Sequence, residues 1–372
     1  MNITSIKHVC HENLLYVKLE TDEGIVGIGE ATLRGKIPAV MEAINLLAAH
    51  VVGTTVFSIE DMFHKYFYQD RWRNGPIMNT AISGVEMAMW DTIGKKLGVP
   101  VYNLLGGKVR EKVQLYANGW SKDNGGDLSK LAEKARNTLE MGFKALKWDP
   151  FPLPELHSPL RHIVTMETVM QGLEQVGAVR EAVGPEIEIF IEGHARLYYD
   201  QALWFVRNAE QYGIGFFEEP MQPDDWEGFK KLALKSNIPI ATGERFFTRW
   251  GHKRLYEEGI CSIAQPDFTH CGGIWESKKM SAMAEAYYVR IAPHNSSGPV
   301  ATMVSAHIDI TLPNFFKQEF FVKNFAINRD LFNNSLNIED GYLILDDKPG
   351  LGISPDWEKL EKGSYKFDPT TW

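Results

Sequence analysis

The feature that most constrains this chain is a repeat of short apolar strands, each followed by a helix-like segment. We identify these strands at 113–119, 143–148, 187–192, 213–219, 238–244, 262–267, 289–294 and 315–320. Most of their starts lie 24 to 30 residues apart, which is room for a strand, a turn, a helix and a second turn. Apolar strands that alternate with helices pack as a parallel sheet. Eight such units predict an α/β protein built on a modified (β/α)8 TIM-type barrel.

The segment before the repeat has a different pattern. In "NLLYVKLETDEGIVGIGEA" two alternating runs flank the turn sequence DEG, which predicts a β-hairpin, and two segments of helical periodicity follow. We therefore expect an α+β capping domain at 1–112 and the barrel at 113–330. The turn-rich tail at 331–372 is expected to pack back on the cap. A Pro-rich insertion, "DPFPLPELHSPLRH", lengthens the connection after the second barrel strand.

Composition excludes several classes of function. The chain has 372 residues and a net charge of −9, so it lacks the basic surface that nucleic acids or anionic lipids require. It contains no apolar run long enough to cross a membrane, and its three cysteines show no metal-binding spacing. Neither a P-loop nor a dinucleotide-binding glycine motif is present. We expect a cytoplasmic protein with no nucleic-acid or membrane partner.

Acidic residues end three consecutive barrel strands at a constant spacing. Glu192, Glu218 and Glu244 are 26 residues apart, and in a barrel the carboxyl ends of strands converge on one face. Carboxylates that close repel one another, and a hard divalent cation with oxygen ligands relieves that repulsion. The spacing therefore predicts a Mg²⁺ site. Glu219 points to the opposite face from Glu218, so we expect it to bind a basic side chain or a helix N-terminus.

Two histidines accompany these acids. Asp267 and His294 end neighbouring strands, where a carboxylate can orient an imidazole and make it a better base. A buried histidine bonded to a backbone carbonyl is the alternative reading. His194 follows Glu192 by two residues, so strand alternation places both on one face. This makes His194 a candidate acid on the metal side.

The motifs "IEGH", "FFEEP", "ATGER", "QPDFTHCGG" and "APHNSSGP" together resemble the enolase superfamily in its mandelate racemase subgroup. The resemblance covers nearly the whole chain. It implies Mg²⁺ held by the three glutamates at the strand ends and a dyad of Asp267 and His294. It also implies that Glu319, on the eighth strand, helps bind the substrate carboxylate or enolate. The chemistry shared by that superfamily is removal of a proton α to a carboxylate.

Two departures select a reaction within the subgroup. Racemases there usually carry Lys-x-Lys on the second strand, whereas "ALKWDP" has Lys147 and then Asp149, which argues against racemisation. The pair Glu192-x-His194 is typical of galactonate and gluconate dehydratase-type members, most of which have Asp as the first ligand. The resemblance implies a Mg²⁺-dependent sugar-acid dehydratase that gives a 2-keto-3-deoxy acid. His294 would remove the α-proton, and His194 would protonate the leaving 3-hydroxyl.

Other assignments stay open at this point. A cycloisomerase, an epimerase with His194 as second base, or a non-catalytic sugar-acid-binding member would fit the same motifs. We expect a homo-oligomer with a small sugar acid as its substrate. Lys147 and Glu319 complete the expected catalytic set. The candidates for substrate binding are Asn118, Trp120, Trp148, Asp149, Arg196 and, in a lid segment of the cap, Arg34.

Overall fold

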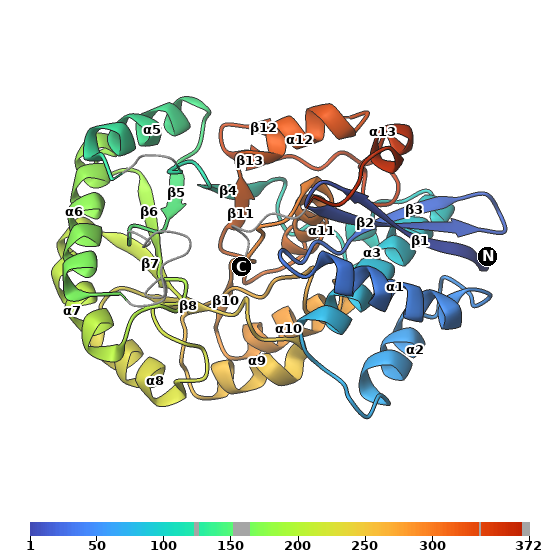
Figure 1. Cartoon of the computed structure of the whole chain (residues 1–372), viewed down its shortest axis with the longest axis horizontal. Coiled ribbons are helices and arrows are strands. Elements are labelled where there is room, and N and C mark those ends of the chain that lie inside the picture. Colours follow the sequence, from blue (N-terminus) through green and yellow to red (C-terminus); the bar gives the residue numbers. More distant parts are fainter. Residues whose placement is uncertain (123–125, 152–163, 335, 367–372) are drawn as a thin grey trace.

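A ring of eight parallel strands forms the centre of the computed structural model, which describes residues 1–122, 126–151, 164–334 and 336–366 (Figure 1). Neighbouring strands pair in chain order, and β11 returns to pair with β4. Hydrogen bonds of Ile291 with Asn314 and Phe316 join β10 to the segment entering β11 and close the ring. The predicted fold class is thereby confirmed. The strands are β4 (Val113–Asn118), β5 (Ala145–Trp148), β6 (Glu188–Glu192), β7 (Ile214–Glu218), β8 (Ile240–Thr242), β9 (Ile263–Ala264), β10 (Arg290–Ile291) and β11 (Gln318–Phe321).

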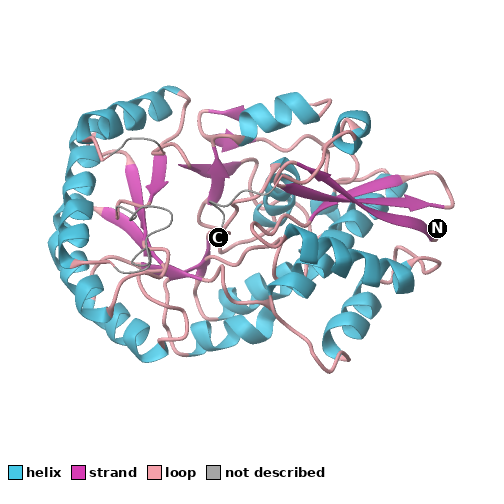
Figure 2. Cartoon of the chain, in the orientation of Figure 1, coloured by secondary structure: helices cyan, strands magenta, loops and turns pink. Residues whose placement is uncertain are grey.

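Helices surround the ring on its outer side (Figure 2). Several of them are amphipathic; α5, for example, buries Leu131 and Ala135 and leaves its other face polar. Inside the ring, Phe190 and Phe216 stack with their ring centroids 4.1 Å apart. Because apolar side chains fill the barrel interior, polar chemistry is confined to its mouth. The helices are α5 (Leu128–Glu140), α6 (Met166–Val183), α7 (Tyr199–Ala209), η2 (Glu210–Tyr212), α8 (Trp226–Lys235), α9 (Thr248–Glu257), α10 (Ile274–Ala286) and α11 (Pro299–Asp309).

The N-terminal cap consists of an antiparallel sheet, β1–β2–β3, covered by helices. Gly29 lets α3 approach the sheet, because a Cβ there would lie 1.9 Å from the carbonyl oxygen of Gly84. The buried carboxylate of Glu30 accepts hydrogen bonds from the N–H groups of Gly298 and Ala301, which ties the cap to the start of α11. The cap elements are β1 (Ile3–His11), β2 (Leu14–Thr21), β3 (Val26–Glu30), α1 (Ile37–Val51), α2 (Ile59–Phe63), η1 (His64–Tyr68), α3 (Pro76–Leu97) and α4 (Val101–Leu104).

The C-terminal segment contacts both parts of the molecule. β13 pairs antiparallel with barrel strand β4, while Lys18 of β2 lies 2.7 Å from Glu361 of α13. The domain boundaries at 112/113 and 330/331 stay a prediction. Most of the Pro-rich insertion lies outside the described residues. No helix within the described ranges is both long and apolar enough to cross a membrane. The elements of this segment are α12 (Asn324–Leu331), β12 (Ile338–Glu339), β13 (Tyr342–Leu343) and α13 (Trp357–Glu361).

Candidate active site

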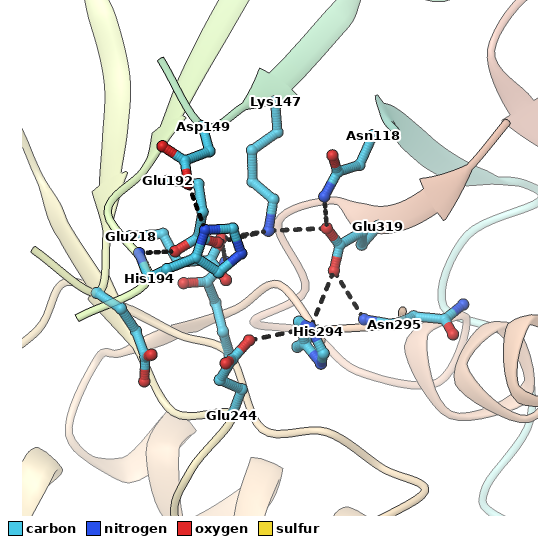
Figure 3. Close-up of polar contacts among 12 residues, drawn as sticks. Asn118, Lys147, Asp149, Glu192, His194, Glu218, Glu244, His294, Asn295 and Glu319 are labelled. Atoms are coloured by element: carbon cyan, nitrogen blue, oxygen red, sulfur yellow. Dashed lines mark hydrogen bonds and ion pairs between the residues drawn. The ribbon is translucent and has the colours of Figure 1, made fainter. Parts of the chain in front are cut away.

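Three glutamates lie together at the barrel mouth, as predicted (Figure 3). Glu192 and Glu218 are register partners at the ends of β6 and β7, and Glu244 lies two residues beyond β8. Glu218 is fully buried and Glu192 nearly so, while the side chain of Glu244 is 17% exposed. We call these three side chains the carboxylate corner. Their burial makes an uncompensated negative charge costly.

Lys147 supplies positive charge to the corner. Its Nζ lies 2.5 Å from Glu218 Oε2, 2.7 Å from Glu319 Oε1 and 3.4 Å from Glu192 Oε2. Burial works against the ammonium, but the neighbouring Glu218 and Glu319 outweigh it, so the pKa of Lys147 is raised well above its ordinary value. Glu218 and Glu319 therefore lie closer to the ammonium than Glu192 does.

One carboxylate oxygen of the corner lacks a hydrogen-bond partner among the described residues. Glu218 Oε1 is buried and has no hydrogen-bond partner within the described chain, and burial together with Glu192 raises the pKa of Glu218. A hard cation is the partner that such an oxygen fits. Among the described residues, no three acidic, histidine or cysteine side chains have the spacing of a metal-ligand set, and Lys147 and His294 pair with the carboxylates instead. Glu219 binds the Arg245 guanidinium at 2.8 Å, and a basic side chain was one of the two partners expected for it.

His294 is held between two carboxylates. Its Nδ1 lies 2.7 Å from Asp267 Oδ2, and its Nε2 lies 2.9 Å from Glu244 Oε2. Asp267 and His294 lie just beyond β9 and β10 and share an isolated parallel bridge. Burial favours the neutral ring, but Glu244 and Asp267 outweigh it and raise the pKa of His294 well above its ordinary value. The predicted neighbours therefore meet in space.

The direction of the His194 side chain is not set by strand alternation, as was predicted, but by the backbone after β6. β6 ends at Glu192, so strand alternation does not set the direction of His194. Its backbone has φ +46°, in the left-handed region, and its N–H donates to Glu192 Oε1 at 2.7 Å. The side chain is 53% exposed, and its Nδ1 lies 2.6 Å from Asp149 Oδ2. Burial lowers the pKa of His194, but Glu192 and Asp149 raise it, with a net value of about 9.

Asp149 was expected to bind substrate, but its carboxylate is occupied. It accepts from both His194 and the guanidinium of Arg196, so these three side chains form one network. The two carboxylate-bound histidines, His194 and His294, flank the corner. Sequence reasoning missed the pairing of Asp149 with His194, because it depends on how β5 and β6 lie side by side.

The remaining predicted residues divide into two groups. Asn118 donates to Glu319 Oε1 at 2.6 Å and so belongs to the site. Trp120 and Trp148 are buried in the apolar core and pack edge to face, 5.6 Å apart. In the structure both rings pack in the core, and their role in substrate binding stays a prediction. Arg34, in the cap, donates to the carbonyl oxygen of Ser296 at 2.5 Å and so lies at the barrel mouth.

A cap on a parallel barrel, with the carboxylates at the barrel mouth, is the architecture of the enolase superfamily. Residues 2–106 match the family model for the mandelate racemase / muconate lactonizing enzyme N-terminal domain, and residues 130–359 match the enolase C-terminal domain-like model. The chain belongs to the mandelate racemase / muconate lactonizing enzyme family of this superfamily.

Named relatives cover nearly the full length of the chain. D-galactonate dehydratase of Pectobacterium atrosepticum is 36% identical over 346 residues, which are 91% of this chain and 88% of the relative. D-gluconate dehydratase of Thermoproteus tenax is 33% identical over 96% of this chain and 70% of its own. The crystal structure of 3,6-anhydro-D-galactonate cycloisomerase from Zobellia galactanivorans superposes with a TM-score of 0.87 at 28% identity, covering 98% of this chain and 99% of that one.

Proposed function

We propose that the protein is a Mg²⁺-dependent hydro-lyase that converts a sugar acid into a 2-keto-3-deoxy acid. The observation that carries the proposal is the pair of histidines, each bound to its own carboxylate and both beside the carboxylate corner. Dehydration needs one group to remove a proton and another to protonate the departing hydroxyl. The names of the galactonate and gluconate dehydratase relatives support the same reaction class.

The carboxylate corner would hold the metal ion through Glu192, Glu218 and Glu244. The buried, unpartnered Oε1 of Glu218 fits this role. When bound, Mg²⁺ would stabilise the negative charge that develops on the substrate carboxylate as the α-proton leaves. Lys147 Nζ and Glu319 Oε1 lie 2.7 Å apart beside the corner, and this pair would orient the substrate.

His294 would act as the base. Its Nε2 accepts the proton from C2 of the substrate, and the electron pair of that C–H bond moves toward the carboxylate. Asp267, bonded to Nδ1, stabilises the imidazolium that results. In the structure Nε2 faces Glu244, a contact that favours the protonated ring. With Glu244 engaged as a metal ligand, the His294 Nε2 would be free to act as the base.

His194 would act as the acid. Its Nε2–H donates a proton to the 3-hydroxyl as the C3–O bond breaks, and water leaves. The resulting enol rearranges to the 2-keto-3-deoxy acid, so the overall change is loss of one water. Asp149 holds Nδ1 of His194, and its negative charge favours the protonated imidazole that an acid needs. The exposed ring is accessible to a bound substrate.

The test is a panel of aldonic and aldaric acids incubated with Mg²⁺ and assayed for 2-keto-3-deoxy product. One acid with rapid, Mg²⁺-dependent product formation is the expected result. Absence of product from every acid would contradict the proposal. Repeating the panel in D2O then reports whether the α-proton exchanges. Exchange without product would show that the base works but that the acids tested belong to the wrong substrate class. No exchange would show that the base is inactive.

A second candidate is a cycloisomerase, because the Zobellia galactanivorans structure shares the fold over almost its entire length. Such an enzyme would use the same base but would form or open a ring without releasing water. A product of unchanged mass from an anhydro sugar acid would favour this reading over dehydration. An epimerase would likewise leave the mass unchanged while inverting C2.

A further inference from the structure

The buried residue His270 lies between Asp267 and the cap, in the turn that joins β9 to α10. Two side chains of the cap helix α3 contact this turn. The Thr80 hydroxyl lies 2.9 Å from His270 Nδ1, and the Ser83 hydroxyl accepts from the N–H of Gly272 at 2.9 Å. At the other end of the imidazole, Nε2 lies 3.5 Å from Asp267 Oδ2. One ring therefore separates the cap from the carboxylate that orients the proposed base.

The neighbouring hydroxyl groups decide which ring nitrogen of His270 carries a hydrogen. A hydroxyl has one hydrogen to donate and lone pairs with which to accept. The Thr80 hydroxyl donates its hydrogen to the carbonyl oxygen of Pro76 at 2.6 Å. The Thr269 hydroxyl, 3.5 Å from His270 Nδ1, donates its hydrogen to Asp267 Oδ1 at 2.5 Å. Both hydroxyls can therefore only accept from His270, which places the hydrogen of the neutral ring on Nδ1.

The other ring nitrogen of His270 then faces Asp267 with a lone pair. The 3.5 Å between His270 Nε2 and Asp267 Oδ2 exceeds the roughly 2.7–3.2 Å of an N–H···O hydrogen bond. His294 Nδ1, by contrast, donates to the same oxygen at 2.7 Å. Burial lowers the pKa of His270 and outweighs the attraction of Asp267, which favours the neutral ring. Of the two imidazoles beside Oδ2, only His294 therefore donates to it.

We propose that His270 is a positioning residue, which reserves the Asp267 carboxylate for the base His294. Thr80 of the cap fixes the hydrogen on Nδ1, so that the lone pair on Nε2 faces Asp267 Oδ2 and leaves this oxygen to His294. A second donor at Oδ2 would share the charge of the carboxylate. It would weaken the base, because the carboxylate stabilises the imidazolium that forms when the α-proton is removed. This inference rests on the proposed function, in which His294 removes that proton.

The first experiment locates the hydrogen on His270 by NMR, in the full-length protein with Mg²⁺ at neutral pH. The histidine rings are labelled with 15N, and the signals of His270 are those that His270→Phe lacks. We expect a hydrogen on Nδ1 and none on Nε2. Thr80→Val cannot accept from Nδ1 and should divide the hydrogen between the two nitrogens, whereas Thr80→Ser should keep it on Nδ1. Ser83→Ala, the matched control, removes a neighbouring bond between cap and loop and should not move the hydrogen. A hydrogen on Nε2 in the unaltered protein would overturn the inference.

The second experiment places a donor beside Asp267 Oδ2. His270→Gln brings an amide N–H group to the position of Nε2, whereas His270→Phe keeps a ring without a donor. The assay follows deuterium entering C2 of the substrate in D2O at saturating acid. We expect exchange to be about tenfold slower in His270→Gln than in His270→Phe, the effect of a competing hydrogen bond to a charged group, with similar KM. Equal rates would overturn the inference. Faster exchange in His270→Gln would overturn it too, because His270 would then act as a donor to Asp267.

Thr80→Val applies the same test from the cap. It should slow exchange without raising KM, and Thr80→Ser should retain most of the rate because it keeps the acceptor. An unchanged rate in Thr80→Val, in spite of a displaced hydrogen on His270, would overturn the inference. If the unaltered protein exchanges the α-proton of no acid, the proposed function fails, and the position of the hydrogen on His270 decides this inference alone.

Discussion

Asp149→Asn separates the two proton transfers. The 2.6 Å contact between Asp149 and His194 is a hydrogen bond to a charged group, and such bonds contribute about 1.5–3 kcal/mol. The Asp149 side chain is only 16% exposed, but the imidazole is half exposed, so solvent screening favours the lower part of that range. We expect dehydration to slow about 10- to 100-fold, since about 1.4 kcal/mol is a factor of ten. Removal of the α-proton by His294 should continue.

The assay for Asp149→Asn follows deuterium entering C2 of the substrate in D2O by NMR, beside the yield of 2-keto-3-deoxy acid. His194→Asn should show the same separation more strongly, and adding Asp149→Asn to it should cost little more, because both act through one group. Asp200→Asn, an exposed acid on α7, is the matched control. A parallel loss of exchange and product would refute the reasoning, because it would mean that Asp149 supports the whole site.

The remaining predictions concern the other charged groups. Glu218→Gln should abolish Mg²⁺-dependent turnover and weaken Mg²⁺ binding in calorimetry; retained turnover would contradict its assignment as a ligand. His294→Asn should slow exchange of the α-proton by about 10²- to 10⁴-fold, the usual contribution of a general base, and persistent exchange would identify another base. Lys147→Met leaves buried carboxylates unpaired and should lower the free energy of unfolding by about 3–5 kcal/mol in EDTA, measured by urea denaturation; an unchanged midpoint would show that these acids are protonated.

The strand periodicity predicted the ring of strands but overestimated the length of the individual strands. The segments 262–267 and 289–294 contain only two strand residues each, Ile263–Ala264 and Arg290–Ile291. Asp267 and His294 still meet, because an isolated bridge continues the parallel pairing beyond the strands. Apolar residues mark where a strand is buried. They do not show where its backbone hydrogen bonding ends.

Side-chain direction was predictable for some site residues and not for others. Lys147 and Trp148 are neighbours on β5, so alternation already requires that only one of them faces the barrel interior. The structure directs Lys147 to the glutamates and buries Trp148 in the core. His194 was not predictable in this way, because its positive φ is a property of the turn after β6. The contact of Asp149 with His194 needs the lateral packing of two strands, which one sequence does not specify.

The closure of the barrel also orders events during biosynthesis. Asn118 on β4 and Glu319 on β11 are joined by a hydrogen bond across 201 residues of chain. A growing polypeptide on the ribosome therefore carries the carboxylate corner before it can complete the β4–β11 side of the site. The cap also docks late, because the backbone partners of Glu30 at Gly298 and Ala301 exist only when the start of α11 has been made. Catalytic competence should thus appear late in translation, and a chain arrested before β11 should be inactive.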